Sequence, residues 1–292
     1  MDHIDSRGLF AHDTMPAVES KRVLPLFSLK GKTAIVTGSA AGIGLGVVEA
    51  FAEAGANVAI WYNSNKKAEQ VAATVAQEYG VKCTAYQVDV SDNAAVDAAV
   101  DQCVQDFGGR LDIMVANAGI PYTQGAMLDG SVEEALHVLR VNLNGVYFCA
   151  RAAGRQFRRQ KKEGTTTDGK PLENFTYGSF IVTASIAAHI ITLPQLFASY
   201  SASKAAVVQL CKSLAVGWAG FARANSICPG YIITDIFEFF SPDARNAWKD
   251  KIPMGREGRV SELKGAYLYL ASDASSYTTG CDMIIDGGYC LP

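Results

Sequence analysis

The sequence predicts an α/β fold in which helices cover both faces of a parallel sheet. Short apolar runs of β-favouring residues alternate with segments whose apolar residues recur at helical spacing, which is the pattern of right-handed βαβ units. Strand-like runs such as Ile113–Ala116 are apolar throughout, as expected where both faces of a sheet are buried. A glycine-rich turn, Gly38–Gly44, also joins the first strand-like run to the first helical segment.

This alternation places seven strands and the helices that connect them. The β-favouring runs predict strands at Thr33–Thr37, Asn57–Trp61, Cys83–Val88, Ile113–Ala116, Gly178–Ala184, Ala224–Ile227 and Asp282–Ile285. The helical spacing predicts helices at Leu45–Ala54, Lys66–Tyr79, Ala94–Phe107, Val132–Arg159, Ser201–Phe221 and Val260–Ala271. A long polar segment, Gln160–Tyr177, predicts a mobile surface loop without a part in the chemistry.

Length and composition favour one large domain. The chain has 292 residues, of which 49% are hydrophobic, and this is enough for the core of a single α/β domain over residues 29–292. Residues 1–28 mix acidic and basic side chains, so they predict a loosely ordered N-terminal arm and neither a secretory signal nor a transit peptide. No stretch approaches the roughly 20 apolar residues of a membrane span. We therefore expect a cytoplasmic protein without membrane contact.

Charge and residue usage exclude several kinds of partner. The formal net charge of −3 gives no basic surface for nucleic acid. The seven cysteines contain no CxxC pair, which indicates free thiols in a reducing compartment. The four histidines are scattered without the spacing of metal ligands, so no metal is expected.

The turn between the first strand and the first helix predicts a nucleotide site. Backbone N–H groups at a helix N-terminus that follows a strand and a glycine turn can receive a pyrophosphate. Gly38 permits the sharp turn, Gly42 lets the backbone approach the phosphates, and Gly44 allows the helix to pack closely on the strand. The spacing is GxxxGxG, not GxGxxG, and a plain tight turn is the alternative interpretation.

Tyr200 and Lys204 form the second informative pair. Positions i and i+4 lie on the same face of a helix, so the ammonium of Lys204 is expected to lower the pKa of the Tyr200 hydroxyl. Such a phenol can donate and accept a proton near neutral pH. An ordinary helix surface is the alternative for this pair taken alone.

Taken together, these motifs resemble the short-chain dehydrogenase/reductase family over residues 29–292. The motifs are TGxxxGxG at Thr37–Gly44, Asn117-Ala118-Gly119, the asparagine of Val141–Gly145, a serine before the tyrosine, YxxxK at Tyr200–Lys204, and Pro229-Gly230. Within the family, stretches such as Ala59–Ser64 and Ile284–Tyr289 resemble the NADPH-dependent sorbose reductase and stereospecific carbonyl reductase branch. The resemblance implies a single doubly wound Rossmann-like domain with a seven-stranded parallel sheet flanked by helices.

The resemblance also implies a catalytic tetrad of Asn142, Ser185, Tyr200 and Lys204. Tyr200 would protonate the carbonyl oxygen, Ser185 would hydrogen-bond the same oxygen, and Lys204 would hold the nicotinamide ribose. Asn142, in a helix that it distorts locally, would position a water for proton supply through Lys204. Asn144 is the competing asparagine. Ser185 lies fifteen residues before the tyrosine, two more than is common in the family, and Ser199 is the other nearby serine.

NADPH is the expected cofactor, because no carboxylate follows the second strand to repel a 2′-phosphate. Tyr62, Asn63 and Ser64 stand there instead, and either lysine that follows could add charge. The implied cofactor-binding residues are Gly38, Ser39, Gly42, Ile43, Gly44, Tyr62, Asn63, Ser64, Asp89, Val90, Asn117, Ala118, Gly119, Tyr200, Lys204, Pro229, Gly230, Ile232 and Thr234. Helix capping is the alternative for Asp89, and turn formation is the alternative for the Asn117 and Pro229 motifs.

The implied reaction is reduction of a ketose such as sorbose or fructose to a polyol. The candidate substrate residues are Ser185, His189, Gln195, Tyr200 and Tyr231, with Tyr122 and Gln124 beside them, because sugar hydroxyls need polar partners. Residues 233–256 would form a substrate lid, and a plain surface helix pair is the alternative for this segment. The alternatives are a broader reductase of ketoesters and aryl ketones, a 3-oxoacyl thioester reductase, and a catalytically silent NADP-binding sensor. A homo-tetramer is expected, assembled through the helices at Val132–Arg159 and Ser201–Phe221.

Overall fold

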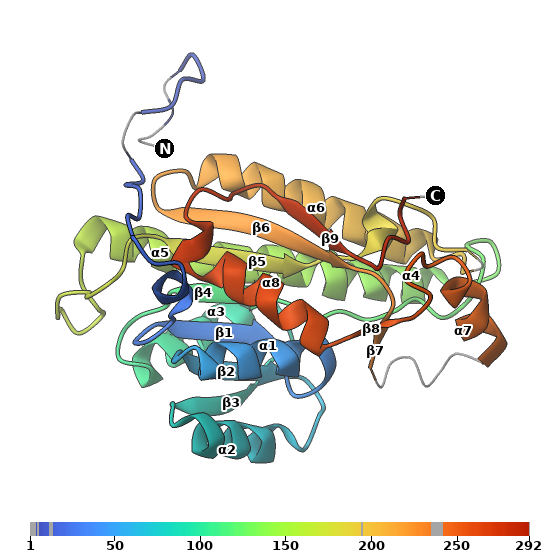
Figure 1. The fold of residues 1–292 in the computed structure, drawn as a ribbon, viewed down its shortest axis with the longest axis horizontal. Helices are drawn as coiled ribbons and strands as arrows, with labels where there is room; N and C mark the ends of the chain where they lie inside the picture. The colour runs from blue at the N-terminus through green and yellow to red at the C-terminus, as the bar shows by residue number, and fades with distance from the viewer. Residues whose placement is uncertain (1–3, 5, 12–13, 194, 235–241, 292) are drawn as a thin grey trace.

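The predicted sheet is present, and its strands are all parallel (Figure 1). The structure is a computed structural model that describes residues 4, 6–11, 14–193, 195–234 and 242–291. The strand order is β3-β2-β1-β4-β5-β6-β9. The strands are β1 (Thr33–Thr37), β2 (Asn57–Tyr62), β3 (Cys83–Gln87), β4 (Ile113–Ala116), β5 (Gly178–Thr183), β6 (Ala222–Pro229) and β9 (Asp282–Ile285). The chain is therefore a Rossmann-like fold, as the sequence predicts.

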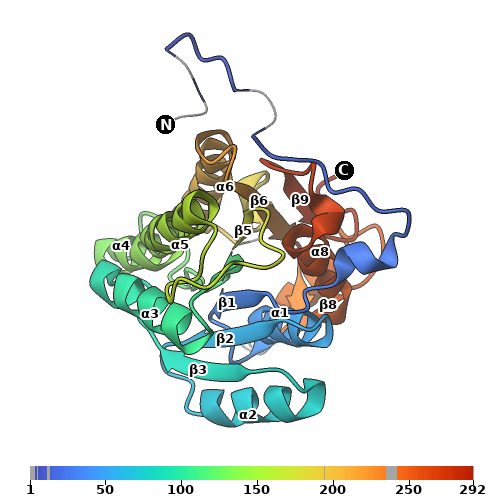
Figure 2. The same cartoon turned by 90° about the vertical axis from the view of Figure 1, so that its left-hand side faces the viewer.

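Helices cover both faces of this sheet (Figure 2). One face carries α1, α2 and α8, and the other carries α3, α5 and α6, with α4 beside α6. The helices are α1 (Gly42–Glu53), α2 (Ala68–Tyr79), α3 (Asn93–Asp106), α4 (Val132–Leu139), α5 (Gly145–Glu163), α6 (Ala198–Gly217), α7 (Pro242–Lys249) and α8 (Ser261–Ala271).

Successive side chains of a strand enter opposite halves of the core, because side chains alternate along a strand. Ile35 of β1 packs in the cluster beneath α3, α5 and α6, whereas Ala34 and Val36 pack in the cluster beneath α1, α2 and α8. Both halves are buried, and this explains why these strands are apolar throughout.

The long helix predicted at Val132–Arg159 is interrupted. A π turn, η2 (Arg140–Asn144), separates α4 from α5, and it contains Asn142, so the expected local distortion is present. Single π turns of this kind often lie at functional sites. α5 then continues to Glu163 and ends at Gly164, which has a left-handed backbone.

The start of the predicted loop Gln160–Tyr177 is therefore helical, which corrects the prediction. Gln160 is fully buried, and its side-chain amide donates to the carbonyl of Leu111 and accepts from the N–H of Leu111, both at 2.7 Å. A buried amide that is satisfied by backbone costs little, although its polarity suggested a surface position.

A second, two-stranded sheet was not predicted. β7 (Ile232–Ile233) pairs in parallel with β8 (Gly258–Arg259). Two residues are too short to produce a recognisable alternation. The predicted lid, residues 233–256, includes residues 235–241, which lie outside the described residues, and it contains α7.

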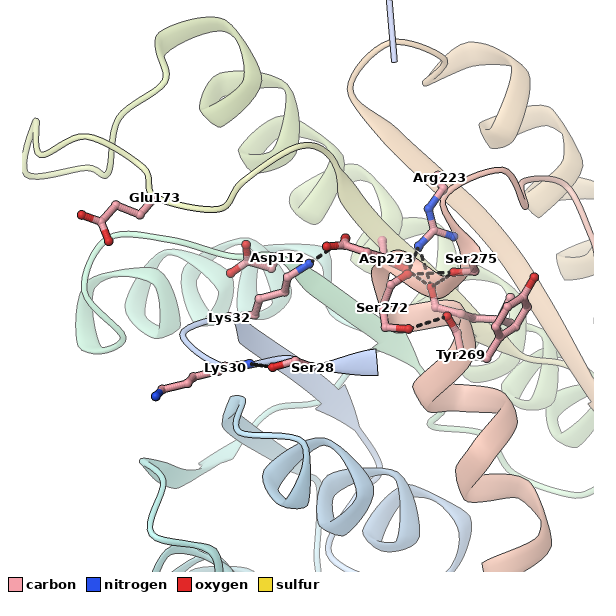
Figure 3. Close-up of polar contacts among 12 residues, drawn as sticks. Ser28, Lys30, Lys32, Asp112, Glu173, Arg223, Tyr269, Ser272, Asp273 and Ser275 are labelled. Atoms are coloured by element: carbon pink, nitrogen blue, oxygen red, sulfur yellow. Dashed lines mark hydrogen bonds and ion pairs between the residues drawn. The ribbon is translucent and has the colours of Figure 1, made fainter. Parts of the chain in front are cut away.

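Polar contacts close the end of the sheet at which the strands begin (Figure 3). Lys32 pairs with Asp273 at 3.1 Å. The buried Arg223 of β6 donates to the carbonyls of Leu270 and Ser272 at the end of α8. β6 begins earlier than predicted, because these carbonyls bind the terminal nitrogens of a guanidinium that the sequence pattern placed outside the strand.

The described residues 4 and 6–11 extend away from the α/β body, whereas the chain from about residue 24 onward lies against it (Figures 1 and 2). The short 3₁₀ helix η1 (Leu24–Phe27) contains no buried residue and lies beside Asp273–Ser275, and Leu29 is the first fully buried side chain among the described residues. Among the described helices, none combines the length and the apolar character that crossing a membrane requires.

Candidate active site

A cavity of about 490 Å³ opens at the carboxyl ends of the strands. It lies where β1 and β4 are neighbours but their connections run in opposite directions, which is the position where open α/β sheets bind ligands. The predicted residues that line it are Gly38, Gly42, Ile43, Gly44, Tyr62, Asn63, Asp89, Val90, Asn117, Ala118, Gly119, Ser185, Tyr200, Lys204, Pro229, Gly230, Ile232 and Thr234. Motifs that are up to 196 residues apart in the sequence therefore meet in one space.

The glycine turn forms one wall of this cavity. Gly38 has a φ of +60°, and a Cβ on it would lie 2.9 Å from the Cα of Ala118 on the neighbouring strand end. A Cβ on Gly44 would lie 2.5 Å from the carbonyl oxygen of Gly38. Side chains at these positions would collide with backbone, so glycine is required for helix α1 to begin this close to β1.

Asn117 fixes the ends of three strands relative to one another. Its side-chain amide donates to the carbonyls of Thr37 and Gly38 at 2.9 and 3.1 Å. Its side-chain oxygen accepts from the hydroxyl of Thr183 at 3.0 Å. The Asn117 side chain thus joins β1, β4 and β5, and Asn117, Ala118 and Gly119 all line the cavity.

Ser185 and Tyr200 meet at the inner end of the cavity. Burial raises the pKa of Tyr200, and a hydrogen bond with the Ser185 side chain lowers it in part. This balance corrects the expectation that Lys204 would lower this pKa. The Lys204 ammonium lies 5.6 Å from the centre of the Tyr200 ring, and no lowering by Lys204 accompanies that approach.

Lys204 is itself strongly affected by its surroundings. Its side chain is buried, and burial lowers its pKa to about 8. The ammonium donates to the carbonyl of Thr183 at 2.9 Å, which holds it beside the cavity. A lysine with a pKa near neutrality can exchange a proton during a reaction.

Asn142 lies behind the cavity and is fully buried. Its side-chain oxygen accepts from the N–H of Ile120 at 2.8 Å, and its side-chain amide donates to the carbonyl of Ile120 at 3.0 Å. The same amide approaches the hydroxyl of Ser203 at 3.3 Å. The side chain therefore clamps the loop after β4, and a role of Asn142 in placing water stays a prediction.

The end of β2 carries no negative charge toward the cavity. Tyr62 and Asn63 line it, and Ser64 is exposed outside the lining. Asp89 lies at the end of the neighbouring β3, and its carboxylate accepts from both the N–H and the hydroxyl of Ser91. The helix cap that was the alternative for Asp89 is provided by Asp92 instead. A ribose 2′-phosphate therefore meets no carboxylate from β2.

Some predicted residues lie outside the lining. Ser39 is fully buried and donates to the carbonyl of Val36 at 2.6 Å. His189 faces Asp282 at 3.4 Å and the thiol of Cys228 at 3.5 Å. The sequence could not predict the contact between His189 and Asp282, because strand β9 and residue 189 are brought together only by folding.

The remaining substrate candidates are also turned toward protein groups. The Tyr231 hydroxyl donates to the side-chain oxygen of Gln195 at 3.1 Å. Tyr122 is only 3% exposed, and the side-chain oxygen of Gln124 accepts from the N–H of Ser131. Direct substrate contacts by these residues stay predictions.

Several residues that line the cavity were not predicted from the sequence. They are Ala41, Val88, Ile120, Pro121, His137, Val141, Thr183 and Ala184. Thr183 and Ala184 directly precede Ser185 at the carboxyl end of a strand. Ligands bind at this end of an open sheet, so the position alone could have predicted that both residues line the cavity. His137 lies on α4, and no local pattern distinguishes it from a surface histidine. The described part of the chain contains no cluster of His, Cys, Asp and Glu suited to a metal.

The chain is similar in sequence to a family of reductases and to individual sugar reductases. A family model described as enoyl-(acyl carrier protein) reductase matches residues 38–290. The chain is 64% identical over 285 residues to an L-xylulose reductase of Hypocrea jecorina, covering 98% of this chain and 99% of that protein. It is 47% identical over 265 residues to the sorbose reductase of Schizosaccharomyces pombe, covering 91% and 98%.

A solved structure agrees at the level of the fold. The NADPH-dependent 3-quinuclidinone reductase of Rhodotorula rubra superposes with a TM-score of 0.88 at 40% identity, and the match covers 97% of this chain and all of that one. The resemblance to sorbose and carbonyl reductases that the sequence suggested is confirmed by these relatives.

Proposed function

The chain belongs to the short-chain dehydrogenase/reductase family, and we propose that it is an NADPH-dependent ketose reductase that forms a polyol reversibly. The observation that carries the proposal is that Ser185, Tyr200 and the buried Lys204 line one cavity. A phenol and a hydroxyl that line the same cavity define a place where a carbonyl oxygen can accept two hydrogen bonds. A catalytically silent sensor needs no such pair.

The chain is an oxidoreductase that uses NADP(H), and the cavity fits that cofactor. Because Gly38 and Gly44 carry no side chain, helix α1 begins close to β1. The backbone N–H groups at the start of α1 can then bind a pyrophosphate. The end of β2 presents Tyr62 and Asn63 without a carboxylate, so a 2′-phosphate is accepted there. When bound, NADPH supplies the hydride.

The protein's own residues supply the proton and fix the reacting group. Tyr200 donates its hydroxyl proton to the carbonyl oxygen and keeps that proton at neutral pH because burial raises its pKa. Ser185 hydrogen-bonds the same oxygen and stabilises its developing negative charge. Lys204, with a pKa of about 8, returns a proton toward Tyr200 after each turnover. Asn142 keeps the loop at Ile120 in place beneath this group.

A ketose is the proposed substrate class because L-xylulose and sorbose are the substrates in the names of the two relatives above. A sugar of the xylulose, sorbose or fructose type fits a site that must satisfy several hydroxyl groups. The solved 3-quinuclidinone reductase favours a second candidate, a broader reductase of ketones and ketoesters.

One substrate panel distinguishes these candidates. Oxidation of NADPH is followed with L-xylulose, L-sorbose and D-fructose, and separately with 3-quinuclidinone, a ketoester and an aryl ketone. We expect the highest kcat/KM for one of the ketoses, and Tyr200→Phe is the control that removes turnover. A kcat/KM at least tenfold higher for an apolar ketone than for every ketose would replace the first proposal by the second.

The domain limits and the assembly are also proposals. Residues 29–292 form the catalytic domain, residues 1–28 form an arm, and residues 233–256 form a lid. A homo-tetramer is supported by exposed apolar side chains on α4 and α5, of which Val132, Leu136 and Tyr147 are at least half exposed. Light scattering of the purified protein measures the assembly directly.

A further inference from the structure

Glu257 is a buried carboxylate that the mechanism does not use. It is 5% exposed and lies immediately before β8. Its two oxygens accept from the Arg245 guanidinium at 3.1 and 2.7 Å and from the Trp248 indole N–H at 3.1 Å, and the Lys249 ammonium is 3.8 Å away. Three residues of one helix, α7, therefore converge on one side chain outside it.

Burying the Glu257 carboxylate is unfavourable in free energy unless all of its hydrogen-bond partners are in place. Removing a carboxylate from water is unfavourable, and a bidentate guanidinium with a further N–H is what repays the cost. Burial alone would raise the pKa of Glu257, but the hydrogen bonds and positive charges around it lower that pKa overall. Glu257 is thus ionised and holds α7 in one orientation relative to β8.

The helix that Glu257 holds is connected to two segments that line the catalytic cavity. Trp248 is fully buried, and its ring stacks on Tyr231 with centroids 4.4 Å apart and an interplanar angle of 11°. Tyr231 lies between Gly230 and Ile232, both of which line the cavity.

The second connection runs to the catalytic serine. Trp248, Ile252 and Tyr289 form one buried cluster with Ile186, and Ile186 directly follows Ser185. α7 therefore packs against both the segment after β6 and the segment that carries Ser185, and a shift of α7 would move both. Figure 1 shows α7 and the β7–β8 pair at the same end of the molecule.

We propose that Glu257 is a positioning residue for the substrate side of the active site. By fixing α7 through Arg245 and Trp248, it sets the position of Tyr231 and Ile186, whose chain neighbours Gly230, Ile232 and Ser185 line the cavity, and so determines the affinity for the carbonyl substrate. This inference rests on the proposed function for the identity of the substrate, but not for the placement of α7.

The test compares wild type with Glu257→Gln, which keeps the shape of the side chain and removes its charge. We expect the KM for L-xylulose to rise about tenfold, kcat to change by less than about threefold, and the Kd for NADPH to change by less than about twofold. Amide hydrogen exchange over residues 245–252 should become faster. A residue that only stabilised the fold would not separate KM from kcat and from cofactor binding.

Two further variants make the result decisive. Arg245→Gln breaks the same pair from the half-exposed side and is expected to reproduce the KM change, so it decides the question if Glu257→Gln does not fold. Glu262→Gln is the matched control, because it removes a bidentate pair with Arg256 that does not involve α7. Its KM should stay at the wild-type value.

The outcomes separate this proposal from the proposed function. Unchanged KM and unchanged exchange in the folded variants overturn the role of Glu257, and so does a rise in the NADPH Kd equal to that in KM. If wild type reduces no ketose, the ketose proposal fails, and KM is measured with the ketone that is reduced. If nothing is reduced, the exchange of residues 245–252 decides, and an unchanged rate overturns the inference.

Discussion

Asn142 holds the backbone of Ile120 at both of its polar groups, with the side-chain oxygen on the N–H at 2.8 Å and the side-chain amide on the carbonyl at 3.0 Å. The π turn places this side chain toward the loop after β4. The loop carries Gly119, and a Cβ added there would lie 3.2 Å from the Asn142 oxygen and 3.4 Å from the Lys204 ammonium. The clamp therefore fixes the backbone against which Lys204 packs.

Replacing Asn142 by aspartate should break this clamp on one side only. The carboxylate keeps an acceptor for the Ile120 N–H but faces the Ile120 carbonyl without a donor. We expect kcat to fall about tenfold or more and the free energy of unfolding to fall by about 1–3 kcal/mol, the cost of an unsatisfied buried acceptor. Steady-state kinetics and urea unfolding measure both. Asn144→Asp, at the neighbouring exposed asparagine, is the control and should leave kcat near wild type.

Ser185→Ala should reduce kcat by about 100-fold or more with little change in NADPH binding, because the hydroxyl acts on the reacting oxygen. Ser199→Ala is a strict comparison. The Ser199 hydroxyl is buried and has no hydrogen-bond partner among the described residues, so its removal should be neutral for turnover. If the two variants were equally active, Ser185 would lose its assigned role.

Lys204 should make stability depend on pH in a defined window. Its pKa is about 8 in the folded chain and about 10.5 when unfolded, so the unfolded state binds the proton more tightly. Stability therefore carries the cost of burying the ammonium below pH 8 and recovers it as the pH rises toward 10.5. Relative to Lys204→Met, the free energy of unfolding of wild type should rise by about 3 kcal/mol across this window.

Urea titrations at several pH values measure this difference. Burial raises the pKa of Cys103 and Cys149 to about 12, and these thiols oppose the trend in both proteins, so only the difference between the variants isolates Lys204. A difference that stayed constant between pH 8 and 10.5 would contradict a lowered lysine pKa.

Asn63→Asp should reverse the cofactor preference. The new carboxylate at the end of β2 repels a 2′-phosphate and accepts from a 2′-hydroxyl. We expect the KM for NADPH to rise about tenfold or more and the KM for NADH to fall. Ser64→Asp places the same charge outside the cavity lining and should have the smaller effect. Equal KM values for NADPH in wild type and Asn63→Asp would mean that the phosphate binds elsewhere.

Local pattern was sufficient for most of the fold. β1 and β4 have the predicted limits, because strand periodicity and turn glycines are encoded within a few residues. The pattern failed where a distant group changed the local preference. Gln160 was placed in a loop, but Leu111 satisfies its amide inside the protein. Arg223 was placed before β6, but carbonyls at the end of α8 bind it within the strand.

The sequence by itself determined the parallel sheet, the glycine turn and the spacing that puts Tyr200 and Lys204 on one helix face, because each depends on residues that are close along the chain. Only the tertiary structure decided that burial and Ser185, not Lys204, govern the pKa of Tyr200, and that His189 faces Asp282. Only the tertiary structure decided, too, that Glu257 binds Arg245 of α7. These properties arise from desolvation and from contacts between chain segments that approach only after folding.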